Sequence, residues 1–174
     1  MSQHPLATNT WDDKELQAIQ SVIERDSYTM GSSVEQFEQD FSKFINRKYC
    51  VMVSSGSAAN LIATAALFYT KNPMLKRGDE VIVPAVSWST TYFPLQQYGL
   101  KLKFVDIDLD TLNYDLEALE SAITSNTKMI MVVNLLGNPN DFDVINSLIN
   151  HNSMYHDQCQ QILTLIRIVA MGSK

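Results

Sequence analysis

Cysteines, prolines and long apolar runs are all scarce in this sequence. Its two cysteines, Cys50 and Cys159, have no spacing typical of a metal or redox motif, which is usual in a reducing compartment. No window reaches the roughly 18 consecutive apolar residues that a helix needs to span a bilayer. The first ten residues lack the basic and apolar regions of a signal peptide. We therefore expect a cytoplasmic protein without a membrane partner, in which Cys50 is a buried structural residue.

Runs of like charge are also missing. Thirteen lysines and arginines against 19 aspartates and glutamates give a formal net charge of −6. Nucleic-acid binding depends on a basic patch, so we expect no DNA or RNA partner. What the chain does have is apolar residues, at 45% of its 174 positions, which is enough for a globular core.

Two amphipathic helices are expected before residue 48. Apolar residues recur at helical spacing behind Asp12 and Asp13, and again behind a turn at residues 29–33. The first set is Leu16, Ile19, Val22 and Ile23, and the second is Val34, Phe37, Phe41 and Phe44. We interpret the phenylalanine stripe as part of the core rather than as a cofactor site.

From Tyr49 onward, predicted strands alternate with predicted helices. We expect strands at residues 49–53, 81–83, 102–107 and 129–133, and helices at 57–69, 91–98, 115–124 and 141–149. Apolar strands that are each followed by a helix are typical of a parallel sheet covered on both faces. Ligands of such sheets bind at the carboxyl ends of the strands, so the loops after Val53, Val83, Ile107 and Val133 are candidates.

The first of these loops, Ser54-Ser55-Gly56-Ser57-Ala58-Ala59-Asn60, joins an apolar run to an alanine-rich helix. Such a turn presents bare backbone N–H groups at a helix N-terminus, where the helix dipole favours an anion. A phosphate seat is one interpretation, and an ordinary N-capped turn is the other.

The remaining loops hold other candidates. Trp88 follows the strand at 81–83 and either stacks on a flat cofactor ring or lies in the core. Residues 134–139, Asn-Leu-Leu-Gly-Asn-Pro, either offer amides to a ligand or form a tight turn. Asp106, Asp108 and Asp110 lack the glycine and glutamate of a calcium-binding loop, so we expect no metal site. We expect the histidines His4, His151 and His156 at the surface.

Together these motifs resemble the DegT/DnrJ/EryC1/StrS family, the pyridoxal-phosphate-dependent enzymes of nucleotide-sugar biosynthesis. The resemblance is carried by residues 29–31, 51–57, 78–91, 104–108 and 134–139. It implies an α/β fold, a partial large domain of the aspartate aminotransferase (type I) fold with a mostly parallel sheet and helices on both faces. Residues 1–48 would form an N-terminal helical segment, 49–150 an incomplete cofactor-binding domain, and 151–174 a divergent tail.

The resemblance also implies a site. Gly56 and Ser57 would bind the phosphate of pyridoxal 5'-phosphate through their amides, and Trp88 would stack on its ring. The loops at 87–91 and 134–139 look most like members that remove the 3-hydroxyl group of a nucleotide-linked 4-keto-6-deoxy sugar, on the route to colitose in O-antigen lipopolysaccharide. In the full-length family, glutamate restores the amino form of the cofactor. The family resemblance further implies a homodimer, and a nucleotide-sugar aminotransferase is the alternative enzyme.

The chain departs from the family pattern near its end. Arg167-Ile168-Val169 stands where the family has the aspartate that pairs with the pyridine nitrogen, although Ala170-Met171-Gly172 resembles the end of that family motif. We interpret residues 151–169 as a local frameshift or a decayed segment. The family's catalytic lysine or histidine lies beyond Lys174, so we assign no catalytic residue. The alternatives are therefore the N-terminal half of such an enzyme, inactive as this chain, or a non-catalytic fragment that binds cofactor or a partner. A dinucleotide-binding module is disfavoured, because Ser-Gly-Ser-Ala-Ala-Asn is not its glycine fingerprint.

Overall fold

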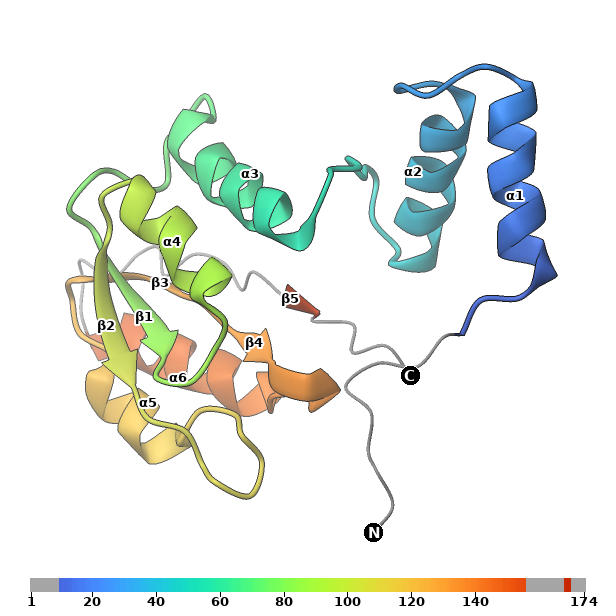
Figure 1. Ribbon diagram of the computed structural model, residues 1–174. Coiled ribbons are helices and arrows are strands. Elements are labelled where there is room, and N and C mark those ends of the chain that lie inside the picture. Colours follow the sequence, from blue (N-terminus) through green and yellow to red (C-terminus); the bar gives the residue numbers. More distant parts are fainter. Residues whose placement is uncertain (1–9, 156–167, 170–174) are drawn as a thin grey trace, which may run out of the picture. The chain divides into compact units, whose positions relative to one another are not determined.

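The structure is a computed structural model that describes residues 10–155 and 168–169 (Figure 1). The chain divides into two compact units, one ending at Ser54 and the other beginning at Ser55. The predictions made for His4, His156, Cys159 and most of the tail lie outside the described residues. Within the described part of the chain, no helix is long and apolar enough to cross a membrane.

The first unit contains helices α1 (Asp13–Glu24) and α2 (Ser32–Phe44), as the apolar spacing predicts. A capping box starts α1, in which the Asp12 side chain accepts the Lys14 amide at 2.7 Å and the Asp12 amide donates to Glu15 at 2.8 Å. Arg25 at the end of α1 donates to the Ser33 hydroxyl at 3.1 Å, which ties the two helices together.

The apolar face of α2 is exposed, so the prediction that its phenylalanines form core is wrong for this chain. Phe37 and Phe41 stack with their centroids 5.6 Å apart, yet both are exposed, and Phe44 is 85% exposed. Ser42 is the buried residue of this helix. Helical spacing shows which face is apolar, but burial needs an opposing surface, and two short helices supply little of it.

Residues 49–53 do not form the predicted strand. Tyr49 and Val51 are exposed, and Cys50 is half-buried rather than enclosed in a core. The Met52 amide donates to the Glu38 carboxylate at 2.7 Å instead of to a neighbouring strand. An apolar run becomes a strand only where a partner pairs with its backbone, and no described strand pairs with this run.

The second unit contains the remaining elements and is built on parallel strands. The three-stranded sheet has the order β2-β1-β3, and a two-stranded pair joins β4 to β5. The predicted strand at 129–133 is thus split into β3 and β4. The elements are α3 (Gly56–Tyr69), β1 (Glu80–Pro84), α4 (Ser89–Gln97), β2 (Lys101–Val105), α5 (Leu116–Ala122), β3 (Thr127–Ile130), β4 (Val133–Asn134), η1 (Leu135–Gly137), α6 (Phe142–Tyr155) and β5 (Ile168–Val169).

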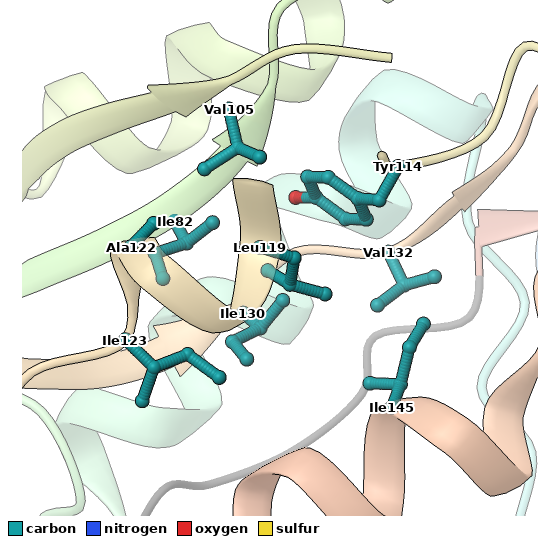
Figure 2. Packing of buried hydrophobic residues seen from close by; sticks show 9 residues of the cluster. All are labelled: Ile82, Val105, Tyr114, Leu119, Ala122, Ile123, Ile130, Val132 and Ile145. Atoms are coloured by element: carbon teal, nitrogen blue, oxygen red, sulfur yellow. The ribbon is translucent and has the colours of Figure 1, made fainter. Parts of the chain in front are cut away.

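Buried residues lie on both faces of the sheet. Ile82 of β1 points to one face, where it packs with Leu119 of α5 and Ile145 of α6, and Figure 2 shows this cluster. Its neighbours Val81 and Val83 point to the other face, under α3 and α4. The prediction of a mostly parallel sheet with helices on both faces is therefore confirmed (Figure 1). The loops after β1 and β2 leave its carboxyl edge as predicted, whereas the candidate loop at 54–60 leads into α3 without a preceding strand.

Candidate functional site

The N-terminus of α3 leaves two backbone donors free. Ser55 is the N-cap, and its hydroxyl accepts the Ala58 amide at 3.2 Å while its carbonyl accepts the Ala59 amide at 3.0 Å. The amides of Gly56 and Ser57, which come before these, have no hydrogen-bond partner among the described residues. The first turn of this 14-residue helix also contains no acidic residue. Two unpaired N–H groups at the positive end of a helix form a seat for an anion.

Gly56 is not required by the packing of this chain. A Cβ atom at this position would meet nothing within 4 Å, and the backbone is not in the left-handed region that favours glycine. What the missing side chain does provide is open space beside the two free amides. A bare backbone at this point suits the close approach of a ligand.

Trp88 lies directly before α4 and is 70% exposed, which contradicts its interpretation as a core tryptophan. The loop that carries it is nevertheless held at two points. The Tyr92 hydroxyl donates to the Pro84 carbonyl at 2.8 Å, and the hydroxyls of Ser87 and Thr91 are hydrogen-bonded at 2.8 Å. The exposed indole therefore projects from a braced backbone.

The starts of α3 and α4 lie side by side. The Asn60 side-chain amide donates to the Thr90 carbonyl at 3.1 Å. Ser57 and Thr90 also line the same hollow of about 210 Å³, together with Phe93. The structure thus brings the predicted phosphate-binding turn and the helix that follows Trp88 onto one surface of the second unit.

The aspartates after β2 serve the loop that contains them. One carboxylate oxygen of Asp108 accepts the amides of Asp110 at 3.1 Å and Thr111 at 2.8 Å. These hydrogen bonds, that of Thr111 foremost, lower the pKa of Asp108. Asp106 likewise accepts the amide of Ile107 at 2.8 Å. Across residues 10–151, whose side chains are described, no group of three acidic, histidine or cysteine side chains is placed to hold a metal ion.

The loop at 134–139 uses its polar side chains mainly to hold its own shape. Asn140 donates through its side chain to the Val133 carbonyl at 2.9 Å and to the Asn134 side chain at 3.0 Å. Asn113 from the loop after β2 donates to the Pro139 carbonyl at 2.9 Å, while its own side-chain oxygen is buried without a partner among the described residues. These contacts hold the turn in place, and the offer of its amides to a ligand stays a prediction.

Two tyrosines anchor strand ends on opposite faces of the sheet. Tyr114, on the face of α5 and α6, donates to the Met131 carbonyl at 2.7 Å, and Tyr92 donates to the Pro84 carbonyl on the face of α4. Burial raises the pKa of Tyr114 well above its ordinary value, with a further contribution from Tyr92. Burial also raises the pKa of Tyr92, which the hydrogen bond from Ser87 partly offsets. Both phenols are therefore neutral hydrogen-bond donors at neutral pH.

Strand β5 lies beside β4. Its residues Ile168 and Val169 pair in parallel with Val133 and Asn134 of β4. Residues 158–174 contain no aspartate or glutamate. The sequence thus offers no aspartate or glutamate in this stretch, where the family resemblance implies the acid that pairs with the pyridine nitrogen.

Sequence reasoning missed Asn60, Thr91 and Tyr92, which hold the two halves of the site. One signal was present for Asn60. Pro94 falls inside a predicted helix, and a proline has no N–H group for the carbonyl four residues earlier. That carbonyl belongs to Thr90, so its position in the sequence indicates an acceptor that is open to a donor from outside the helix.

Comparisons with known proteins agree with this fold. The profile of the DegT/DnrJ/EryC1/StrS aminotransferase family matches residues 9–161. GDP-4-keto-6-deoxy-D-mannose 3-dehydratase of Yersinia pseudotuberculosis is 60% identical over 164 residues, which cover 93% of this chain and 42% of that protein. UDP-2-acetamido-2-deoxy-3-oxo-D-glucuronate aminotransferase of Pseudomonas aeruginosa is 37% identical over 136 residues, covering 78% and 36%.

A solved structure matches as well. It is the GDP-4-keto-6-deoxy-D-mannose 3-dehydratase of Escherichia coli with bound hydrated PLP, at a TM-score of 0.86 and 57% identity, covering 96% of this chain and 41% of that chain. The present chain thus spans about two fifths of the length of the proteins it matches.

Proposed function

The chain belongs to the DegT/DnrJ/EryC1/StrS aminotransferase family, whose members depend on pyridoxal phosphate, and we propose that it is the part of a nucleotide-sugar 3-dehydratase that binds this cofactor. One observation carries the proposal. The only first-turn amides of α3 left without a partner in the described chain are those of Gly56 and Ser57, the two that the family resemblance assigns to the phosphate.

The donors at this site fit the proposed group. A phosphate dianion needs N–H donors and a positive field, and α3 offers two free amides with no carboxylate in its first turn. An aromatic ring needs a flat apolar surface, and the exposed indole of Trp88 offers one near the same helix ends. When bound, the cofactor supplies an electron sink for the sugar chemistry.

The residues of this chain would bind and orient. Gly56 and Ser57 would fix the phosphate, and Trp88 would fix the plane of the ring. Proton transfer and the partner of the pyridine nitrogen are tasks for which the described residues offer no placed group. We therefore propose that the 174-residue chain binds the cofactor without turning over substrate, so that substrate, glutamate and a homodimer belong to a complete enzyme.

The proposed substrate is a GDP-linked 4-keto-6-deoxy sugar, as the name of the Yersinia relative suggests for that protein. Its use in O-antigen synthesis and a cytoplasmic location are parts of the same proposal. An aminotransferase of this family is the second candidate, and the 37% identity to the Pseudomonas aminotransferase favours keeping it.

Binding is best tested with pyridoxamine 5'-phosphate, because it has no aldehyde to react with the exposed lysines. In a Trp11→Phe background, the ligand should quench the fluorescence of the remaining tryptophan, Trp88. Trp88→Ala, followed by the ligand's own absorbance, should lower the affinity about fivefold, because one stacking contact is lost. The stability of this variant should match that of the parent, since the indole is 70% exposed.

Two results would contradict the proposal. Absence of any saturable binding by the parent chain would show that the seat does not hold the cofactor. Turnover of GDP-4-keto-6-deoxymannose with glutamate by the purified chain alone would show that it is a complete catalyst.

A further inference from the structure

We propose that Asn60 is a positioning residue that sets the spacing between the phosphate-binding amides of Gly56 and Ser57 and the ring-stacking Trp88. The inference rests on the proposed function and deepens it. It assigns a role to a side chain that touches neither the phosphate nor the ring, and it does so from one hydrogen bond and from the proline that makes this bond necessary.

The bond joins the N-terminal parts of the two helices that carry the site: Asn60 lies just beyond the first turn of α3, and Thr90 lies in the first turn of α4. Asn60 lies three residues beyond Ser57, about one helical turn, and Thr90 lies two residues beyond Trp88. The Asn60 side-chain amide donates to the Thr90 carbonyl at 3.1 Å, and Asn60 is only 7% exposed. Loss of this hydrogen bond should therefore alter the position of the N-terminus of α3 relative to that of α4.

Pro94 explains why the bond exists. In a regular helix the carbonyl of Thr90 would accept the N–H group of residue 94, but proline has none. A partly buried carbonyl gains from a donor when its own helix supplies none, and a side chain from outside the helix can provide it. Asn60 supplies that partner, which converts a local defect of α4 into a link between α3 and α4.

The link matters for a ligand that has two binding parts. The phosphate and the ring belong to one molecule. Once the phosphate is bound, the ring therefore meets Trp88 at high effective concentration, but only if the two binding sites are correctly spaced. Thr91 and Tyr92 hold the loop of Trp88 within α4, but neither reaches α3 in the hydrogen bonds of the described chain. Asn60 is thus the polar contact that relates one seat to the other.

The test separates spacing from stability. Asn60→Leu keeps a similar volume and removes the donor, and Pro94→Ala returns an N–H group to the Thr90 carbonyl. Asn60→Leu should lower the affinity for pyridoxamine 5'-phosphate about tenfold. Inorganic phosphate and pyridoxamine, each titrated alone and followed by NMR, should bind the variant as they bind the parent, within about twofold.

The double variant distinguishes a role of Asn60 in spacing from a role in stability alone. In Asn60→Leu/Pro94→Ala the Thr90 carbonyl regains a donor, so the urea midpoint should recover while the affinity for the joined ligand stays low. Pro94→Ala alone is the matched control and should bind like the parent, because the Thr90 carbonyl oxygen has two lone pairs and can accept both the restored N–H group and Asn60. Recovery of affinity in the double variant would overturn the inference, because Asn60 would then act only through stability.

A readout without any ligand keeps this inference distinct from the proposed function. With Trp11→Phe in place, Asn60→Leu should reduce the fluorescence anisotropy of Trp88, because the start of α4 loses its tether. Unchanged anisotropy would count against the positioning role even if the cofactor binds. A parent chain that binds neither phosphate nor the joined ligand would instead overturn the cofactor seat itself.

Discussion

Gly56→Ala should raise the stability of the chain while weakening its binding of the cofactor. The new methyl group would meet nothing within 4 Å, and the backbone at Gly56 lies outside the left-handed region. At such a position, alanine restricts the unfolded chain and stabilises the fold by about 0.4–1 kcal/mol. The effect on folding is therefore favourable and small.

The effect on binding has the opposite sign. The methyl group would occupy the open space next to the free amides of Gly56 and Ser57, where a phosphate has to approach. Displacing the anion from one amide forfeits a hydrogen bond to a charged group, worth about 1.5–3 kcal/mol. The affinity for pyridoxamine 5'-phosphate should thus fall about 10- to 100-fold.

Urea unfolding and the fluorescence titration of Trp88 measure the two effects on one sample. Gly31→Ala is a suitable control for binding, because Gly31 also stands at the N-terminus of a helix but belongs to the first unit. Its affinity should equal that of the parent. The reasoning is refuted if Gly56→Ala lowers the urea midpoint, or if it binds the ligand as tightly as the parent does.

Three further predictions concern the scaffold of the site. Tyr114→Phe removes the hydrogen bond to Met131 and should lower the free energy of unfolding by about 1–2 kcal/mol in urea titrations. Burial raises the pKa of Tyr114, so its phenol ionises at lower pH in the unfolded chain than in the folded one. The parent should therefore lose stability as the pH rises above 10.0, and the variant should lose less. Equal pH slopes for the two proteins would contradict this. Thr91→Val should cost about 1 kcal/mol by removing one hydrogen bond of the Ser87 hydroxyl, and Thr91→Ser should cost less. The reverse order would argue against a stabilising pair of hydroxyls. Asn113→Ala should speed amide exchange in the loop at 134–139, and unchanged exchange rates would mean that this tether is not needed.

The sequence predicts the second unit well because its patterns are local. Strand composition and helical spacing locate β1 and α5, and the capped turn at Ser55 locates the N-terminus of α3. The free amides of that turn follow from helix geometry alone, which is why they can be predicted. The roles of Gly56, Ser57 and Trp88 toward a cofactor stay predictions.

What the sequence does not predict depends on partners that are distant along the chain. Residues 49–53 have the composition of a strand, but no described strand pairs with them. The phenylalanines of α2 have the spacing of a core face, but no described surface buries them. The link from Asn60 to Thr90 spans 30 residues, so only the position of Pro94 pointed to it in advance.

Neighbouring residues of β1 point to opposite faces of the sheet, and this determines which mutations the fold can tolerate. Ile82 serves one buried cluster and Val81 and Val83 serve the other, so loss of a single codon within this strand would move each side chain to the wrong face. The described members of both clusters all precede residue 150. Mutation beyond residue 155 would therefore leave those members intact, and such a gene would still encode the sheet, its two layers of helices and the turn at Gly56.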